Sequence, residues 1–277
     1  MKNNILEINN LKVFPNNNSG LKLVKNISLI LKKGKTTCIV GESGSGKSLT
    51  ALSVMQLLSS QLNMSGSIVF EGVNLVGLTK EEVRRKRGKD IAMIFQEPMT
   101  SLNPVLTIGY QIEEAIRVHE SMYKTELNNR VEELLNIVGI PTDRINSYPD
   151  ELSGGQRQRV MIAMAISCSP KLLIADEPTT ALDVTVQAQI LNLLNDLKLK
   201  FEMTMLFITH DFGVVEDIAD DVAVMFQGEI VEQGSVANVL KKPQHPYTRA
   251  LLDCVPDAYG KKDLKPIDYA VLKELMG

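Results

Sequence analysis

The chain has 277 residues, of which 23% are charged, and a formal net charge of -3 at pH 7. Because no long basic run occurs, the sequence gives no electrostatic sign of nucleic-acid binding and no source of attraction to a membrane surface. No uncharged apolar run approaches the roughly 20 residues of a membrane span, and the first residues lead into no signal-peptide core, so a cytoplasmic protein is expected. The three scattered cysteines argue against a disulfide framework or a zinc site, and Cys38 is expected to pack in the core.

The first forty residues predict an antiparallel sheet. Apolar residues alternate with polar ones at 5–13, 21–24 and 27–31, and a turn cluster at 15–20 separates the first two groups. Residues 67–70 are typical of a further strand of this sheet. Phe14 lies in this region, and its ring either packs in the core or stacks on a nucleotide base.

A glycine-rich stretch at residues 41–48 is the most informative part of the sequence. It reads Gly41-Glu42-Ser43-Gly44-Ser45-Gly46-Lys47-Ser48 and fits G-x-x-x-x-G-K-[ST], the phosphate-binding loop of nucleotide triphosphatases. Glycines let the backbone turn successive N–H groups inward at a helix N-terminus, which makes a nest for anions. Lys47 would reach the β- and γ-phosphates, and the Ser48 hydroxyl would bind Mg²⁺. The alternative is a turn that binds nothing, but a buried strand at 36–40 and helical spacing after the loop favour phosphate binding.

The next segment places a polar residue after a buried strand. Residues 80–89 are dense in charge and predict a solvated helix without chemistry. Residues 91–95 predict a buried strand, and Gln96 follows at its carboxyl end, where ligand contacts collect in α/β sheets. Residues 107–139 are expected to be helical.

Two further strand or helix ends carry candidate residues. Ser153 is a plausible N-cap of the next helix, and Gly154 and Gly155 leave its first N–H groups uncovered, although such a start is often only a cap. The buried strand at 172–175 ends in Asp176 and Glu177. These acids suit a Mg²⁺-bound water and a base for the attacking water, or else they are turn residues.

The last third of the chain predicts one more site residue and a hairpin. A third buried strand at 205–209 ends at His210, whose imidazole could donate to a γ-phosphate, although a single histidine is more often structural. Residues 222–226 and 230–234 predict a hairpin, and residues 236–240 a short helix. From Pro243 the sequence becomes a tail rich in proline and charge.

The order of these pieces resembles the ATP-binding subunit of ATP-binding-cassette transporters over essentially the whole chain. The resemblance is carried by the phosphate loop, Gln96, the run Leu152-Ser153-Gly154-Gly155-Gln156, the run Leu172-Leu173-Ile174-Ala175-Asp176-Glu177, Ala181-Leu182-Asp183 and His210. Within that family, residues 96–104 and the run His245-Pro246-Tyr247-Thr248-Arg249-Ala250-Leu251-Leu252 look like the oligopeptide, dipeptide and nickel importers. The resemblance therefore implies a peptide or nickel importer.

The resemblance implies a fold and a domain organisation. The expected fold is an α/β P-loop NTPase (RecA-like) core with an antiparallel β subdomain and an inserted helical subdomain at about 105–165. The ATPase domain would comprise residues 1–242, and a family-specific tail residues 243–277. Relatives with a longer tail carry a cysteine cluster for an iron–sulfur centre, but this tail has only Cys254, so no iron–sulfur cluster is expected.

The resemblance also implies roles for single residues. Two copies or homologues would meet head to tail, with each ATP between the phosphate loop of one and the start of the Ser153 helix of the other. Gln96 would sense Mg²⁺ and the permease, Glu177 would be the base, Asp183 would bridge the subunits and His210 would contact the γ-phosphate. Phe14 matches the adenine-stacking aromatic only loosely. Met99 and Leu102, in the loop after Gln96, would receive a short permease helix, or else pack on the helical region.

The expected partners are two membrane permease subunits, a second ATPase and, indirectly, an extracytoplasmic solute-binding protein. The expected location is the cytoplasmic face of the cell membrane. The alternative is a soluble cassette protein that acts on nucleic acid or ribosomes. It is disfavoured because the segment between Ser48 and Leu152 has no sustained heptads and no basic stripe.

Overall fold

The computed structural model describes residues 3–97, 101–180 and 182–254, which form two compact units. Unit 1 comprises Met1–Val76 and Phe207–Gly277, and unit 2 comprises Gly77–Leu206. The division falls inside strand β8 (Thr204–Thr209), which begins in unit 2 and ends in unit 1. Met99 lies outside the described residues, as does the tail beyond residue 254.

Unit 1 contains the predicted antiparallel sheet, with the strand order β2-β1-β4-β5. The strands are β1 (Asn4–Pro15), β2 (Val24–Lys32), β4 (Leu62–Phe70) and β5 (Val73–Asn74). Buried and exposed residues alternate along β2, as expected where one face of a sheet packs on a core. In register, Ile8 of β1 lies opposite Leu29 of β2 and Ile68 of β4, and all three side chains are buried. The prediction for this part of the chain is confirmed.

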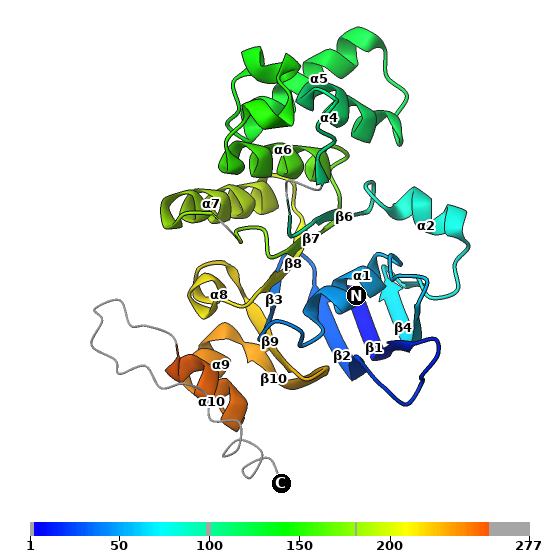
Figure 1. The fold of residues 1–277 in the computed structure, drawn as a ribbon, viewed down its shortest axis with the longest axis vertical. Coiled ribbons are helices and arrows are strands. Elements are labelled where there is room, and N and C mark those ends of the chain that lie inside the picture. The colour runs from blue at the N-terminus through cyan, green and yellow to red at the C-terminus, as the bar shows by residue number, and fades with distance from the viewer. Residues whose placement is uncertain (1–2, 98–100, 181, 255–277) are drawn as a thin grey trace. The chain divides into compact units, whose positions relative to one another are not determined.

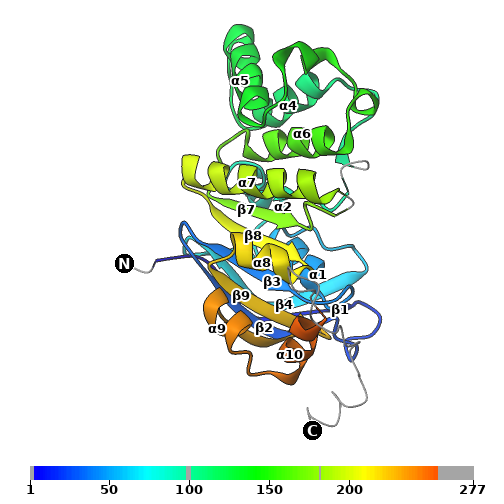
Figure 2. The ribbon, with the colours of Figure 1, turned by 90° about the vertical axis from the view of Figure 1, so that its left-hand side faces the viewer.

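A second group of strands in unit 1 carries the phosphate loop. Strand β3 (Thr36–Val40) is buried throughout and pairs in parallel with β9 (Asp221–Phe226), which pairs antiparallel with β10 (Glu229–Ser235). Up to residue 254, the helices of this unit are α1 (Lys47–Val54), α8 (Phe212–Ile218), α9 (Val236–Lys241) and α10 (Pro246–Asp253). Helix α9 packs on β9 and β10, with α10 nearby in both ribbon views (Figures 1 and 2). The predicted hairpin and short helix are confirmed, but α10 was not predicted.

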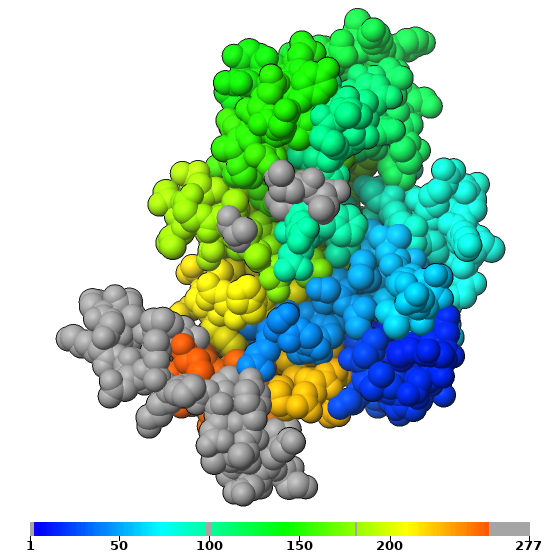
Figure 3. Space-filling view, viewed as in Figure 1, coloured from blue at the N-terminus to red at the C-terminus, as the bar shows by residue number. Residues whose placement is uncertain are grey.

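Unit 2 contains two parallel strands and most of the helices. Strand β6 (Ile91–Ile94) pairs with β7 (Leu172–Asp176), and every residue of both is buried. The helices within the described part of this unit are α2 (Lys80–Lys86), α4 (Ile108–Arg117), α5 (Lys124–Ile137), α6 (Gly154–Ile166) and α7 (Val184–Lys200), with the short 3-10 helices η1 (Thr142–Asn146) and η2 (Pro149–Glu151). Helices α4, α5 and α6 pack against one another, and Figure 3 shows them as one closely packed group in green.

The segment predicted as helical at 107–139 is two helices. The first, α4, starts where the Thr107 hydroxyl accepts a hydrogen bond from the backbone N–H of Tyr110. The second, α5, starts where the Glu126 carboxylate accepts one from the N–H of Tyr123. Val118 and Tyr123, which flank the break, are exposed, so no buried face holds this stretch in a continuous helix.

The thiol of Cys38 lies in the core of β3, as predicted. Burial in apolar surroundings raises its pKa far above the usual value, because the thiolate would be desolvated there. Cys38 is therefore an inert packing residue and not a reactive one.

Candidate functional site

The phosphate loop connects β3 to α1, as its motif requires. Gly44 and Gly46 have φ angles of 79° and 104°, a region that side chains rarely occupy. A Cβ at Gly41 would lie 2.1 Å from the carbonyl oxygen of Met225, so the loop approaches β9 too closely for any side chain. A Cβ at Gly44 would meet no atom within 4 Å, so this part of the loop borders open space. The loop is thus packed on one side and open on the other.

The Lys47 side chain is buried against the loop. Its ammonium donates hydrogen bonds to the carbonyl oxygens of Gly41 (2.8 Å) and Glu42 (2.9 Å). Ser43 and Gly44 are exposed and Ser48 is partly exposed, whereas the Ser45 hydroxyl is buried without a hydrogen-bond partner among the described residues. A positive charge and an unsatisfied hydroxyl in a glycine loop at a helix N-terminus fit the binding of a phosphate chain.

Phe14 lies in unit 1, as the phosphate loop does, and its ring is half-buried. Its neighbour Val13 accepts a backbone hydrogen bond from Leu23 (2.8 Å), and the Leu23 carbonyl would be 3.1 Å from a Cβ at Gly46. Phe14 therefore lies at the end of β1 that is close to Gly46 of the loop. This position is compatible with stacking on a base, which stays a prediction.

Unit 2 brings two of the predicted catalytic residues together. The Gln96 side-chain amide donates to a Glu177 carboxylate oxygen (3.2 Å), and the Thr180 hydroxyl donates to the same oxygen (2.9 Å). Glu177 has a φ angle of 47°, which is uncommon for a residue with a side chain. Asp176 is buried at the end of β7. Thr180 was not predicted, although its place three residues after Glu177 in the same turn was visible in the sequence.

The other candidate residues of unit 2 lie at helix starts. The Ser153 hydroxyl caps α6 by accepting from the Gln156 N–H (3.3 Å), and the Gln156 side chain accepts from the Ser153 N–H (3.0 Å). This capping box confirms the predicted N-cap. Asp183 caps α7 by accepting from the Val186 N–H (2.9 Å). Ser153, Gly154 and Asp183 are exposed.

His210 follows β8 in unit 1 and is exposed.

Leu102 was predicted to receive a permease helix or to pack on the helical region. Its side chain is only 3% exposed, so it belongs to the core of unit 2 and the first option is wrong.

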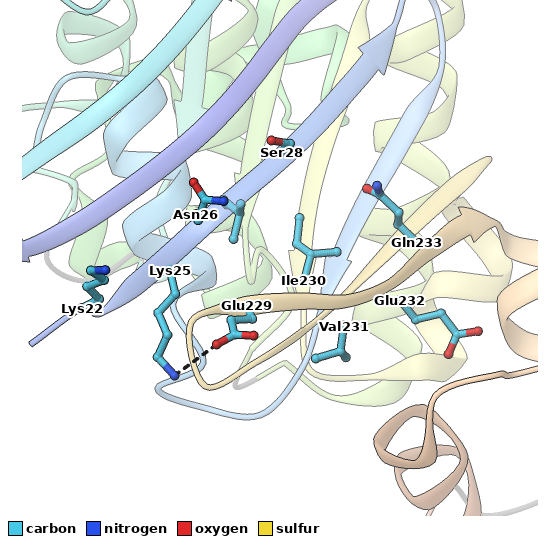
Figure 4. A pocket seen from close by; sticks show the side chains of 10 residues that line it. Lys22, Lys25, Asn26, Ser28, Glu229, Ile230, Val231, Glu232 and Gln233 are labelled. Carbon is cyan, nitrogen blue, oxygen red and sulfur yellow. Dashed lines mark ion pairs between the residues drawn. The ribbon is translucent and has the colours of Figure 1, made fainter. Parts of the chain in front are cut away.

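A polar cavity of about 750 Å³ lies between β2 and β10 in unit 1 (Figure 4). Its wall includes an ion pair of 3.4 Å between Lys25 and Glu229, drawn as a dashed line in the figure. None of the predicted site residues lines this cavity, so it is separate from the phosphate loop.

Comparison with known protein families identifies the chain. A family model described as "ABC transporter" matches residues 24–180, which is more than half of the sequence. The chain belongs to the ABC transporter family. A second model, "Oligopeptide/dipeptide transporter, C-terminal region", matches residues 231–275. The ABC membership and the importer subfamily predicted from the motifs are both confirmed.

Curated relatives agree with this assignment. The oligopeptide transport ATP-binding protein OppD of Bacillus subtilis is 48% identical over 270 residues, which span 95% of this chain and 75% of the relative. The AppD protein of the same organism is 50% identical over 94% of this chain and 80% of its own length. The glutathione import ATP-binding protein GsiA of Escherichia coli is also 50% identical, but the match spans only 44% of that longer protein.

Solved structures support the fold. The ATP-binding cassette MJ0796, solved as a dimer in a post-hydrolysis state with ADP and Pi, has a TM-score of 0.74 and 28% identity over 83% of this chain and 98% of its own. CbiO1 of Clostridium perfringens has a TM-score of 0.75, also at 28% identity, over 87% of this chain and 92% of its own. The predicted P-loop NTPase fold is confirmed. This ABC protein is an ATP-binding ATPase of the importer class, and the comparisons do not support the alternative role on nucleic acid.

None of the helices in the described ranges has both the length and the apolar character needed to span a membrane. The relatives of the chain are ATP-binding subunits of membrane transporters, which is consistent with peripheral association with a membrane.

Proposed function

We propose that this ABC protein hydrolyses ATP to drive the uptake of peptides through a membrane permease, as a dimer or paired with a second ATPase at the cytoplasmic face. The observation that carries the proposal is a phosphate loop with a buried lysine, in a chain that matches peptide-importer ATPases over nine-tenths of its length. Nickel is the other solute considered from the sequence. Peptides are favoured because OppD, AppD and GsiA are named for oligopeptides or glutathione, which is itself a short peptide.

Binding of ATP would begin at the phosphate loop. Lys47 would exchange the carbonyl oxygens of Gly41 and Glu42 for phosphate oxygens, while the N–H groups of Ser43, Gly44 and Gly46 surround the anion. Phe14 would contact the adenine. This exchange replaces hydrogen bonds to neutral carbonyls with stronger bonds to a charged group, which favours the bound state.

The residues that would hold Mg²⁺ are Ser48, Gln96 and Asp176, which offer the oxygen ligands this ion prefers. When bound, the ion supplies charge neutralisation at the phosphates. A site of few protein ligands suits Mg²⁺, which normally keeps several waters and phosphate oxygens.

Hydrolysis would depend on Glu177 as the base that orients water. Hydrogen bonds from Gln96 and Thr180 hold its carboxylate in place. His210 would donate to the γ-phosphate. Ser153, Gly154 and Gly155 at the start of α6 would close on the ATP of the second subunit, and Asp183 would bridge the two subunits.

The test combines binding with transport. Lys47→Ala should raise the Kd for ATP at least about tenfold, because charged hydrogen bonds contribute roughly 1.5–3 kcal/mol. The chain, reconstituted in vesicles with its partner permease subunits, should import a labelled oligopeptide only with ATP. Unchanged ATP affinity in the variant would refute the nucleotide assignment. Uptake of Ni²⁺ without peptide uptake would refute the proposal that peptides are the transported solute.

A further inference from the structure

Helix α10 is fastened to strand β10 by one carboxylate. Glu232 of β10 accepts hydrogen bonds from the backbone N–H groups of Gln244 (2.8 Å) and His245 (3.0 Å), directly before the helix. Partial burial of Glu232 pushes its pKa up, but the hydrogen bonds that it accepts outweigh this and leave the pKa below its usual value. The carboxylate is therefore charged near neutral pH and holds the start of α10 in place.

The first turn of α10 places an aromatic residue in the core. The Tyr247 side chain is completely buried, and its ring lies on that of Phe226 from β9, with 4.1 Å between centroids and 34° between planes. The His245 imidazole accepts the Tyr247 N–H (3.2 Å) and caps the helix. A ring packed in this way has little freedom to move, so its hydroxyl has a defined position.

The Tyr247 hydroxyl reaches the phosphate loop. It accepts a hydrogen bond from the backbone N–H of Glu42 (3.4 Å). That N–H belongs to the same peptide group as the Gly41 carbonyl, which accepts the Lys47 ammonium (2.8 Å). Because a peptide group is planar, fixing its N–H also fixes the direction of its C=O. Tyr247 and Lys47 thus hold opposite ends of one peptide group.

We infer that Tyr247 is a positioning residue for nucleotide binding, through which the C-terminal region of this chain sets the phosphate loop. This inference rests on the proposed nucleotide role of the loop and adds to it a residue some 200 positions away in sequence. The hydroxyl keeps the Gly41–Glu42 peptide, and with it the backbone of the loop, in one orientation. ATP then meets an ordered loop, and less conformational entropy is lost on binding.

The test is Tyr247→Phe in the full chain, which keeps the buried ring and removes only the hydroxyl. We expect KM and Kd for ATP to rise about two- to fivefold, the effect of a single long neutral hydrogen bond. The kcat should change less than about twofold, because the water-orienting Glu177 is untouched. Tyr123→Phe is the matched control, since it removes the same hydroxyl from an exposed ring and should alter neither constant.

The measurements are made at a temperature well below the Tm of both the wild type and Tyr247→Phe. Under that condition any unfolded fraction lowers kcat and leaves KM unchanged. An unchanged KM and Kd in Tyr247→Phe would overturn the inference, whether or not the Tm falls. A raised KM supports it.

Lys47→Ala, measured beside it, separates the two proposals. If Lys47→Ala loses ATP binding while Tyr247→Phe binds like the wild type, only the role of Tyr247 fails. If Lys47→Ala binds ATP normally, the nucleotide role of the loop fails.

Discussion

Gly155 has a packing reason to be glycine, independent of any contact with nucleotide. A Cβ at this position would lie 2.7 Å from Cγ1 of Val186 on α7, closer than side chains approach one another. A valine in a helix is nearly confined to one rotamer, so it cannot swing away. At Gly154 the nearest atom to a Cβ would be Cδ2 of Leu182 at 3.8 Å, an ordinary contact.

These two glycines predict opposite effects on stability. Gly155→Ala should lower the free energy of unfolding by about 1 kcal/mol or more, because overpacking outweighs the gain in helix propensity. Gly154→Ala should raise it by some tenths of a kcal/mol, because only the propensity gain remains. Urea unfolding of both variants measures the difference. Equal stabilities would contradict the tight contact between α6 and α7.

The sequence predicted single residues well where a local motif places them. Lys47 and Ser153 occupy predicted positions because the loop and the capping box are made within a few residues of chain. The hydrogen bond from Gln96 to Glu177 joins two such motif residues, and their roles stay predictions. Tyr247 lies in the run 245–252 that resembles the importer family, but the sequence predicts no role for it. Its contact with Glu42 depends on tertiary packing, which no local pattern encodes.

At the scale of elements, buried strands were predictable and helix breaks were not. Strands β6 and β7 are buried on both faces, so they read as continuous apolar runs. The break between α4 and α5 carries no proline, and α10 begins with a proline in a stretch that resembled a polar tail. Pro246 occupies the first turn of α10, a position at which proline is favoured.

The start of α4 carries the exposed apolar side chains that suit a permease contact. Val105 is 75% exposed, and Tyr110 and Tyr148 are also exposed. The Ile108 N–H donates to the Ser147 carbonyl (2.9 Å), so the start of α4 lies against the segment that precedes Tyr148. The turn before α4 is fixed from within, since the buried Gln111 side chain donates to the carbonyls of Asn103 (3.0 Å) and Leu106 (2.9 Å). A rigid turn that presents apolar side chains to solvent is typical of an interaction site.

Val105→Asp should therefore reduce association with the permease and peptide uptake about tenfold or more, since a charge in an apolar contact is costly. The ATPase activity of the isolated subunit should be unchanged, because Val105 lies in no core. Val118→Asp is the control, as Val118 is 61% exposed at the other end of α4. Association is measured by co-purification with the permease. Equal losses in both variants would show a general effect of charge on α4 and not a contact at its start.

For the whole molecule, the residues proposed to act on ATP come from both units. Lys47, Ser48 and His210 belong to unit 1, whereas Gln96, Asp176 and Glu177 belong to unit 2. Their joint action on ATP stays a prediction, which rests on a resemblance that spans the chain in a fixed order. The two compact units divide the chain after residues 76 and 206. These divisions do not test the domain boundaries at 105–165 and 243–277, which stay predictions.

The whole-molecule prediction concerns the dimer. Glu177→Gln keeps the size of the side chain and its capacity to accept from Gln96 and Thr180, but removes the negative charge that would orient and deprotonate water. ATP hydrolysis should fall about 10²- to 10⁴-fold, the usual contribution of a general base, while ATP binding is kept. Because bound ATP would then persist between the subunits, the variant should accumulate as an ATP-dependent dimer. Steady-state turnover and sedimentation with and without ATP measure both effects, and Glu132→Gln on the exposed face of α5 is the control. Near-normal turnover in Glu177→Gln would instead assign the main catalytic role to His210.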